Sequence, residues 1–124
     1  MLDAIEKMRK LLSGNKETDI NVDSLMEDED FQRHVKREEF ETLIDAFMRE
    51  FTMSLKKSLA KSGLSPDHID FVELVGEATR IPVVQESIKI TFKKKELSQT
   101  LNRQDCIARG CAIQAAIIKS NNPY

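Results

Sequence analysis

The segment Phe71–Pro82, FVELVGEATRIP, constrains the fold of this 124-residue chain more than any other. The apolar run Ile69–Val75 is typical of a strand covered on both faces in a parallel sheet. Gly76 then predicts a tight turn, and Thr79 is predicted to cap a helix that carries Pro82 in its first turn. A strand, turn and helix in this order can present backbone N–H groups and a helix N-terminus to a phosphate or a nucleotide.

The N-terminal third predicts one helix followed by a hairpin. Apolar residues recur at helical spacing over residues 2–12, and turn chemistry follows at 13–15. Polar and apolar residues alternate over 18–23, which favours a half-exposed strand. The acidic residues 27–30 would form a turn, and residues 31–35 would return as the second strand.

Helical patterns dominate the rest of the chain. One apolar stripe predicts a continuous helix from Arg37 to Gly63, and Ser65–Asp67 predicts a single further turn. The helix after the glycine turn and the last helix, which is expected to begin at Asn102 or just after it, complete the chain. The inner face of the first of these two helices is predicted to consist of Val84, Ile88 and Phe92.

The predicted order is therefore helix, hairpin, helix, strand, helix, helix, which is an α/β chain with too few strands to close a sheet. A lone strand buried on both faces needs partner strands, and this chain does not obviously contain them. The sequence thus predicts a fragment of a larger α/β fold.

Composition narrows the function classes. Lys and Arg number 19 against 21 Asp and Glu, which gives a net charge of −2 and no support for nucleic-acid or membrane-surface binding. The basic run 93–95 is interpreted as a solvated helix exit, since no aromatic residues interleave it. No apolar run approaches the roughly 20 residues of a membrane span. The N-terminus lacks a secretory signal pattern, and Cys106 and Cys111 lack a metal-binding spacing. These features predict a cytoplasmic protein without a metal site of its own.

Four segments carry a resemblance to a known family. Residues 75–82, VGEATRIP, resemble the Val-Gly-Gly-Ala/Ser-Thr-Arg-Ile-Pro motif of the seventy-kilodalton heat-shock chaperone superfamily. Residues 96–102 and 108–117 resemble the end of its ATPase domain, and their sequences are most similar to the large, hundred-and-ten-kilodalton branch. Residues 4–13 resemble its adenosine-contacting helix. The likeness covers essentially the whole chain.

This resemblance implies part of an actin-like, ribonuclease-H-like ATPase fold. Residues 1–44 would belong to the upper subdomain of its second lobe, and residues 45–124 to the lower subdomain. The parent protein would bind ATP or ADP with magnesium. As a co-chaperone of the large branch, it would promote nucleotide exchange on a partner heat-shock chaperone and meet unfolded polypeptide clients. The residues that position metal and attacking water would lie on phosphate loops outside this chain, so no catalytic residue is expected within it.

The resemblance also implies a set of nucleotide-binding residues. Glu77 stands where the family has a glycine, and Gln104 where it commonly has an aspartate. A like charge about 4 Å from a phosphate would cost on the order of 1 kcal/mol in water. Glu77 either blocks the pocket or swings outward, and nucleotide affinity stays open. The implied set is Glu6, Arg9, Lys10, Ser13, Gly76, Glu77, Ala78, Arg80, Ile81 and Gln104.

Two functions follow from these observations. The first is a nucleotide-binding-lobe fragment of a chaperone. The alternative is a non-enzymatic protein-interaction module, in which the charged hairpin and the exposed helix faces bind protein and the nucleotide site is vestigial. Nucleic-acid binding through residues 93–95 is a weaker third reading, because it has only a short basic run to support it.

Overall fold

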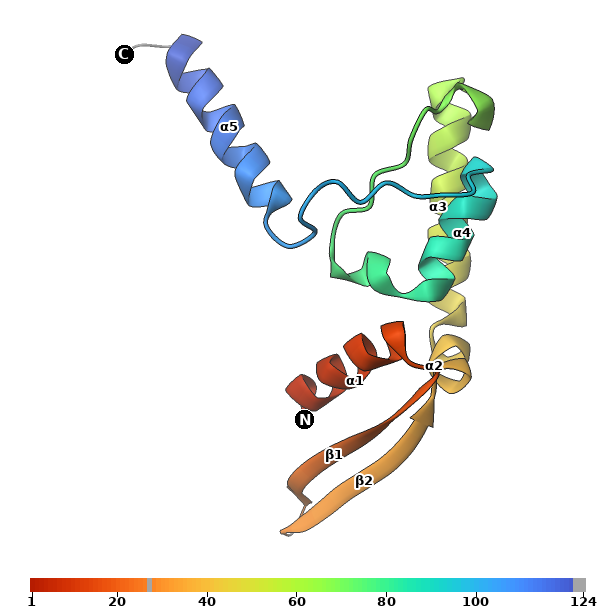
Figure 1. Ribbon diagram of the computed structural model, residues 1–124, viewed down its shortest axis with the longest axis vertical. Coiled ribbons are helices and arrows are strands. Elements are labelled where there is room, and N and C mark those ends of the chain that lie inside the picture. The colour runs from red at the N-terminus through yellow and green to blue at the C-terminus, as the bar shows by residue number, and fades with distance from the viewer. Residues whose placement is uncertain (27, 122–124) are drawn as a thin grey trace.

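A β-hairpin crossed by one helix forms the N-terminal part of the computed structural model, which describes residues 1–26 and 28–121 (Figure 1). The elements are α1 (Leu2–Gly14), β1 (Glu17–Met26) and β2 (Glu29–Lys36). The two strands pair antiparallel from Glu17 opposite Lys36 to Val22 opposite Phe31. Helix α1 covers one face of the hairpin, and a small core of Leu12, Ile20 and Val35 is buried between them.

The predicted hairpin is confirmed, and both strands are longer than the pattern indicated. The register shifts between Val22 and Met26. There Ser24 adopts a positive φ of 48°, and its backbone N–H donates to the Asp30 carboxylate at 2.9 Å. Part of the acidic segment that was expected to turn belongs to β2, because that strand begins at Glu29. Glu27 lies outside the described residues.

The predicted continuous helix is wrong at one point. The structure has two helices, α2 (Arg37–Leu43) and α3 (Asp45–Ser62), which are separated at Ile44 with φ −95° and ψ 4°. The Ile44 N–H still donates to the Phe40 carbonyl at 3.2 Å, and Phe40, Ile44 and Phe51 pack against the same core on both sides of the break. Periodicity reports which face is apolar, and it is insensitive to one non-helical residue. The predicted stop at Gly63 is confirmed by its left-handed φ of 69°.

A second core lies where α4 (Pro82–Phe92) packs beside α3, as Figure 1 shows. The Thr52 and Ser87 hydroxyls are hydrogen-bonded across this contact at 2.7 Å. Val84 and Ile88 are buried as predicted, with Phe92 packed against them. The remaining members of this core are Met48, Leu74 and Ile81.

The predicted strand at 69–75 is wrong. This segment is extended, but it makes one parallel bridge, Glu73 to Ser98, and no strand of a sheet. Its hydrogen bonds run from the Leu74 N–H to the Ser98 carbonyl at 3.0 Å and from the Ser98 N–H to the Val72 carbonyl at 2.9 Å. Within the described residues, its neighbour is an irregular loop, and a ladder needs a second regular strand.

The predicted cap at Thr79 is also wrong. Thr79 lies inside a short 3₁₀ helix, η2 (Glu77–Arg80), and its hydroxyl donates backward to the Gly76 carbonyl at 2.7 Å. Helix α4 begins after this turn with Pro82 at its first position. A second 3₁₀ turn, η1 (Pro66–His68), confirms the short turn predicted after Gly63.

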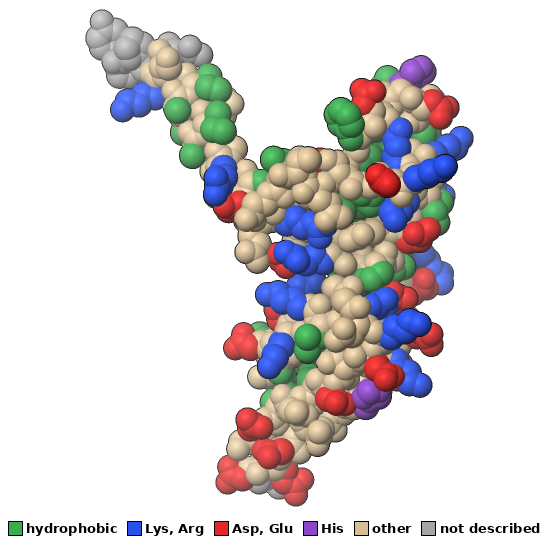
Figure 2. Space-filling model, viewed as in Figure 1, with side chains coloured by type: hydrophobic (Ala, Val, Ile, Leu, Met, Phe, Trp, Pro, Cys, Tyr) green, Lys and Arg blue, Asp and Glu red, His purple; other side chains and the backbone are tan. Residues whose placement is uncertain are grey.

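The last helix, α5 (Cys106–Asn121), projects away from the rest of the chain (Figure 1). It begins later than Asn102, because the Arg103 carbonyl accepts a hydrogen bond from the Gly76 N–H at 3.2 Å and holds the preceding residues as a loop. Its isoleucines are exposed, for example Ile107 at 66% and Ile113 at 63%. Figure 2 shows these apolar side chains along α5, and acidic side chains gathered at the hairpin end.

Candidate functional site

The glycine turn has a backbone that only glycine adopts readily. Gly76 has φ 90° and ψ 151°, a region that is unfavourable for residues with a Cβ. Glu77 follows as the first residue of η2 and is not among the residues with positive φ. The glutamate therefore replaces the second glycine of the motif without backbone strain, and its effect on the site comes from its side chain.

The loop after α4 is held beside this turn by a carboxylate. Glu73 accepts hydrogen bonds from the Leu101 N–H at 2.9 Å and from the Thr100 hydroxyl at 3.2 Å. Hydrogen bonding, from Ser98 first and then from the Leu101 backbone, lowers the pKa of Glu73. These bonds favour the ionised carboxylate and place residues 102–104 next to Gly76.

A polar cleft of about 320 Å³ opens beside the turn. Its walls include two guanidinium groups and three side-chain amides, and no carboxylate of the described residues lines it. Such a surface favours a ligand with negative charge or with hydrogen-bonding ring edges. The lining residues are Arg80, Gln99, Leu101, Asn102, Arg103 and Gln104.

The predicted residues of α1 lie on one face of that helix, as their spacing requires. The Arg9 guanidinium binds the Glu6 carboxylate through two bonds, Nε at 2.8 Å and Nη2 at 2.6 Å. Arg9, with a smaller contribution from Lys10, lowers the pKa of Glu6 to about 2. The Ser13 hydroxyl donates to the Arg9 carbonyl at 3.1 Å. Glu6 therefore stays ionised and fixes the orientation of Arg9.

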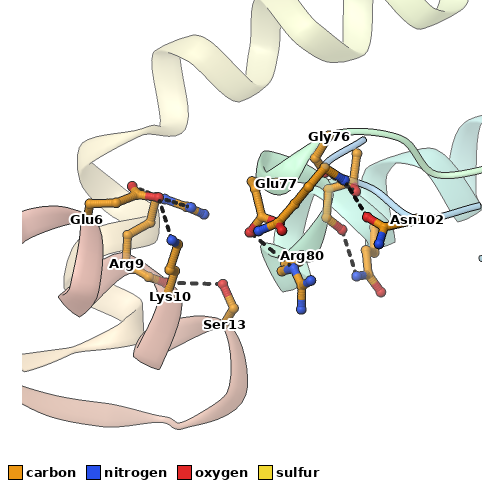
Figure 3. Close-up of polar contacts among 11 residues, drawn as sticks. Glu6, Arg9, Lys10, Ser13, Gly76, Glu77, Arg80 and Asn102 are labelled. Carbon is orange, nitrogen blue, oxygen red and sulfur yellow. Dashed lines mark hydrogen bonds and ion pairs between the residues drawn. The ribbon is translucent and has the colours of Figure 1, made fainter. Parts of the chain in front are cut away.

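This face of α1 looks toward η2 in Figure 3. The Glu77 side chain is 27% exposed, and its Oε2 lies 3.2 Å from the Arg80 Nε. The Arg9 side chain is 17% exposed. The hydrogen bond to Glu6 raises the pKa of Arg9, and the negative charge of Glu77 acts in the same direction. The Glu77 side chain is therefore directed toward Arg80 and is not extended into solvent.

The structure separates the predicted set into three groups. The four α1 residues face Glu77 and Arg80, while Arg80 and Gln104 line the polar cleft. Ala78 is exposed, and Ile81 is buried in the core between α3 and α4. Sequence reasoning missed the cleft residues Gln99, Asn102 and Arg103. Asn102 carried a usable signal, because its side chain accepts from the Gln104 N–H at 2.9 Å in a turn that asparagine favours.

These residues fit the adenosine part of a nucleotide better than its phosphates. The guanidinium groups of Arg9 and Arg80 can stack on a purine, and the amides of the cleft can bond its edges. The Gly76 N–H, in contrast, already donates to the Arg103 carbonyl. Glu77 adds a negative charge at the same turn.

The part of the chain that the structure describes is residues 1–26 and 28–121. No group of three or more His, Cys, Asp or Glu side chains is placed there to hold a metal ion. None of the helices in residues 1–26 and 28–121 has the length and apolar character needed to cross a membrane.

Comparison with known proteins places these features in a family. Residues 1–123 match the family described as "Hsp70 protein". Heat shock 70 kDa protein 16 of Arabidopsis thaliana is 44% identical over 113 residues, which is 91% of this chain and 15% of that protein. Heat shock protein hsp88 of Neurospora crassa is 40% identical over 118 residues, 95% of this chain and 16% of that protein.

A heat shock protein homolog of Saccharomyces cerevisiae is 41% identical over 117 residues, which is 94% of this chain and 17% of that protein. The chain therefore spans between 15% and 17% of the length of these three relatives.

Proposed function

This chain belongs to the Hsp70 protein family, and from that premise we propose that it is part of the nucleotide-binding lobe of a chaperone. The adenosine of ATP or ADP lies between the Arg9 face of α1 and Arg80 of η2. Glu6 and Ser13 orient Arg9, and Gln104 contributes to the polar cleft beside the base. Lys10 is the second cation of the α1 face.

One observation carries this proposal. Two arginines that are far apart in the sequence, Arg9 and Arg80, lie on facing elements (Figure 3), and Arg80 also lines the polar cleft. Each guanidinium is oriented by a carboxylate, Glu6 for Arg9 and Glu77 for Arg80. A planar cation on either side is suited to enclose a planar, electron-rich base.

We extend the proposal to the position of this chain in an actin-like ATPase fold. Residues 1–44 form the upper subdomain of the second lobe, and residues 45–124 form part of the lower subdomain. The helix break at Ile44 and the separation of the two cores support this division. The nucleotide then lies at the junction of the two parts.

The whole protein is proposed to act as a cytosolic chaperone of the large branch. It would bind ATP or ADP with magnesium, promote nucleotide exchange on a partner heat-shock chaperone, and meet unfolded polypeptide clients. The similarity to hsp88 and to the Saccharomyces cerevisiae homolog supports this assignment. No hydrolytic step is assigned to the residues of this chain.

Calorimetric titration of ADP into the chain tests the site. We expect Arg80→Gln to weaken binding about tenfold, which corresponds to the loss of one stacking guanidinium. Arg49→Gln is the matched control, because Arg49 also forms an ion pair within one helix, with Asp45, and lies on α3 away from the cleft. Equal losses in both variants would contradict the proposed site.

The alternative function, an interaction module with a vestigial nucleotide site, is favoured by one observation. Helix α5 exposes Ile107, Ile113, Ile117 and Ile118, a surface that suits another protein better than water. Glu77→Gly separates the two functions, because restoring glycine should strengthen ADP binding if the site is used. Absence of ADP binding by both the original chain and Glu77→Gly would favour the interaction module.

A further inference from the structure

We propose that Glu77 is an internal counter-anion of the site, which pairs with Arg80 and faces Arg9 in the ligand-free chain and must be displaced by a phosphate. The site then accepts an uncharged nucleoside more readily than a nucleoside diphosphate. This inference rests on the proposed nucleotide site for its ligand preference. Its effect on the ligand-free chain is independent of any ligand.

Arg80 already has a carboxylate partner in the ligand-free chain. Its Nε lies 3.2 Å from the Glu77 Oε2, within the single turn of η2. The Arg80 side chain is 51% exposed, so water alone would solvate it without a fixed partner. Glu77 instead keeps the guanidinium beside the turn and neutralises it. An incoming anion therefore meets a cation that already has its carboxylate.

Two buried polar atoms, one on α1 and one on η2, lack a hydrogen-bond partner in the described part of the chain. The Arg9 Nη1 and the Glu77 Oε1 are both buried and without a hydrogen-bond partner among the described residues. One is a donor with positive charge and the other is an acceptor with negative charge. They lie on facing elements, and Figure 3 shows the Arg9 side chain extending toward Glu77. A direct pair between them would satisfy both groups at once.

Glu6 occupies only part of the Arg9 guanidinium. Its Nε and Nη2 are bound by Glu6, which leaves Nη1 as the nitrogen available to a second group. The Coulombic influence of Glu77 already reaches Arg9 and raises its pKa, after the larger effect of Glu6. Glu77 therefore acts electrostatically on Arg9 of α1, although the two residues are far apart in the sequence.

A double-mutant cycle on the ligand-free chain is the first test. Arg9→Gln, Glu77→Gln and the double variant are compared by thermal unfolding. We expect the loss of melting temperature in the double variant to be about 2 °C or more smaller than the sum of the single losses. Lys7 with Glu77 is the control cycle, because Lys7 lies on the α1 face that borders Asp19 and Ile20 of the hairpin. Additive losses in the Arg9 cycle would overturn the proposal.

Titration with ADP and with adenosine, at one ionic strength, is the second test. We expect Glu77→Gln to improve ADP affinity about fivefold relative to adenosine, the effect of removing one like charge near 4 Å. Glu86→Gln removes the same charge from the groove between α3 and α4, which Glu86 lines, so it should leave the ratio unchanged. An unchanged ratio in Glu77→Gln would overturn the ligand preference.

The two tests fail in distinguishable ways. If no variant binds ADP or adenosine, the proposed nucleotide site is wrong, and the thermal cycle alone decides whether Glu77 links the two elements. If the ligands bind but the Arg9 cycle is additive, the nucleotide site stands and the internal counter-anion is wrong.

Discussion

The hairpin and the segment 69–75 both carry the sequence pattern of a strand, and they fold differently. Strands β1 and β2 are joined by a short connection and form a regular ladder. Segment 69–75 has the more apolar sequence, yet it makes a single bridge to Ser98. Leu74 is nevertheless 2% exposed, because α3 and α4 cover it. An apolar run therefore reports burial, whereas a ladder requires a second strand in register.

Removing one core residue from each region should have the largest effect on stability. Leu12 and Leu74 are 1% and 2% exposed, so Leu12→Ala and Leu74→Ala should each lower the free energy of unfolding by about 2–5 kcal/mol. Amide hydrogen exchange should show the loss in β1 and β2 for the first variant, and in α4 for the second.

An exposed leucine provides the control for both variants. Leu43 is 83% exposed, so Leu43→Ala should change stability by no more than about 0.5 kcal/mol. Equal loss of protection in both regions for either core variant would show that they form one cooperative unit.

Phe40 connects the two regions, because it packs against both core clusters. Phe40→Ala should cost about 2 kcal/mol, less than a fully buried phenylalanine, since the side chain is only partly buried. The expected signature is a loss of cooperativity, with hairpin and α4 probes giving different urea midpoints. Phe47→Ala, at a position that is 64% exposed on α3, is the control and should keep the midpoints together.

The sequence predicted those parts of the fold whose conformation is determined by residues close together in the chain. Gly63 ended α3 as expected, because glycine accepts the left-handed conformation. The hairpin was predicted because alternation and a nearby partner act together. The break at Ile44 and the missing strand at 69–75 depend on tertiary contacts that periodicity does not contain.

The candidate site shows the same division. The spacing of Glu6, Arg9 and Ser13 predicts one helix face, and the structure has it. The cleft formed by Arg103 and its neighbours was missed, because a loop distant in sequence brings them to the turn. The assignment of these residues to a nucleotide stays a prediction.

The loop contact of segment 69–75 can be weakened without touching its core. Glu73→Gln replaces the carboxylate that accepts hydrogen bonds from Leu101 and Thr100 with a neutral amide. Hydrogen exchange of the Leu101 amide should therefore become faster. Because the pKa of Glu73 is lowered from 4.5, the ionised group stabilises the fold above about pH 4.5, and this contribution is lost as pH falls through the folded pKa.

The Glu73 prediction is checked by hydrogen exchange at two pH values on either side of that transition. Glu96→Gln, in the same loop, is the control. An unchanged Leu101 exchange rate in Glu73→Gln would show that the backbone bonds to Ser98 hold the loop without the carboxylate.

The smallest expected effect belongs to the hairpin and depends on pH. His34 lies opposite Asp19 in the register, with its Nδ1 2.8 Å from the Asp19 carboxylate and its Nε2 3.3 Å from Glu17. Asp19 first, and then Glu17, raises the pKa of His34 above 6.5. The protonated ring therefore stabilises the hairpin fully below about pH 6.5, and this contribution is lost as pH rises through the folded pKa.

Amide protection factors in β1 and β2 are measured across this pH range at low salt, because His34 is exposed and salt screens its ion pairs. His34→Gln should remove the pH dependence from the hairpin, whereas His68→Gln, on η1, should leave it in place. Because segment 69–75 has no such cross-strand pair, its exchange should not follow the same transition. If the pH dependence of the hairpin survives in His34→Gln, another titrating group causes it. The backbone ladder would then hold the hairpin together without a contribution from His34.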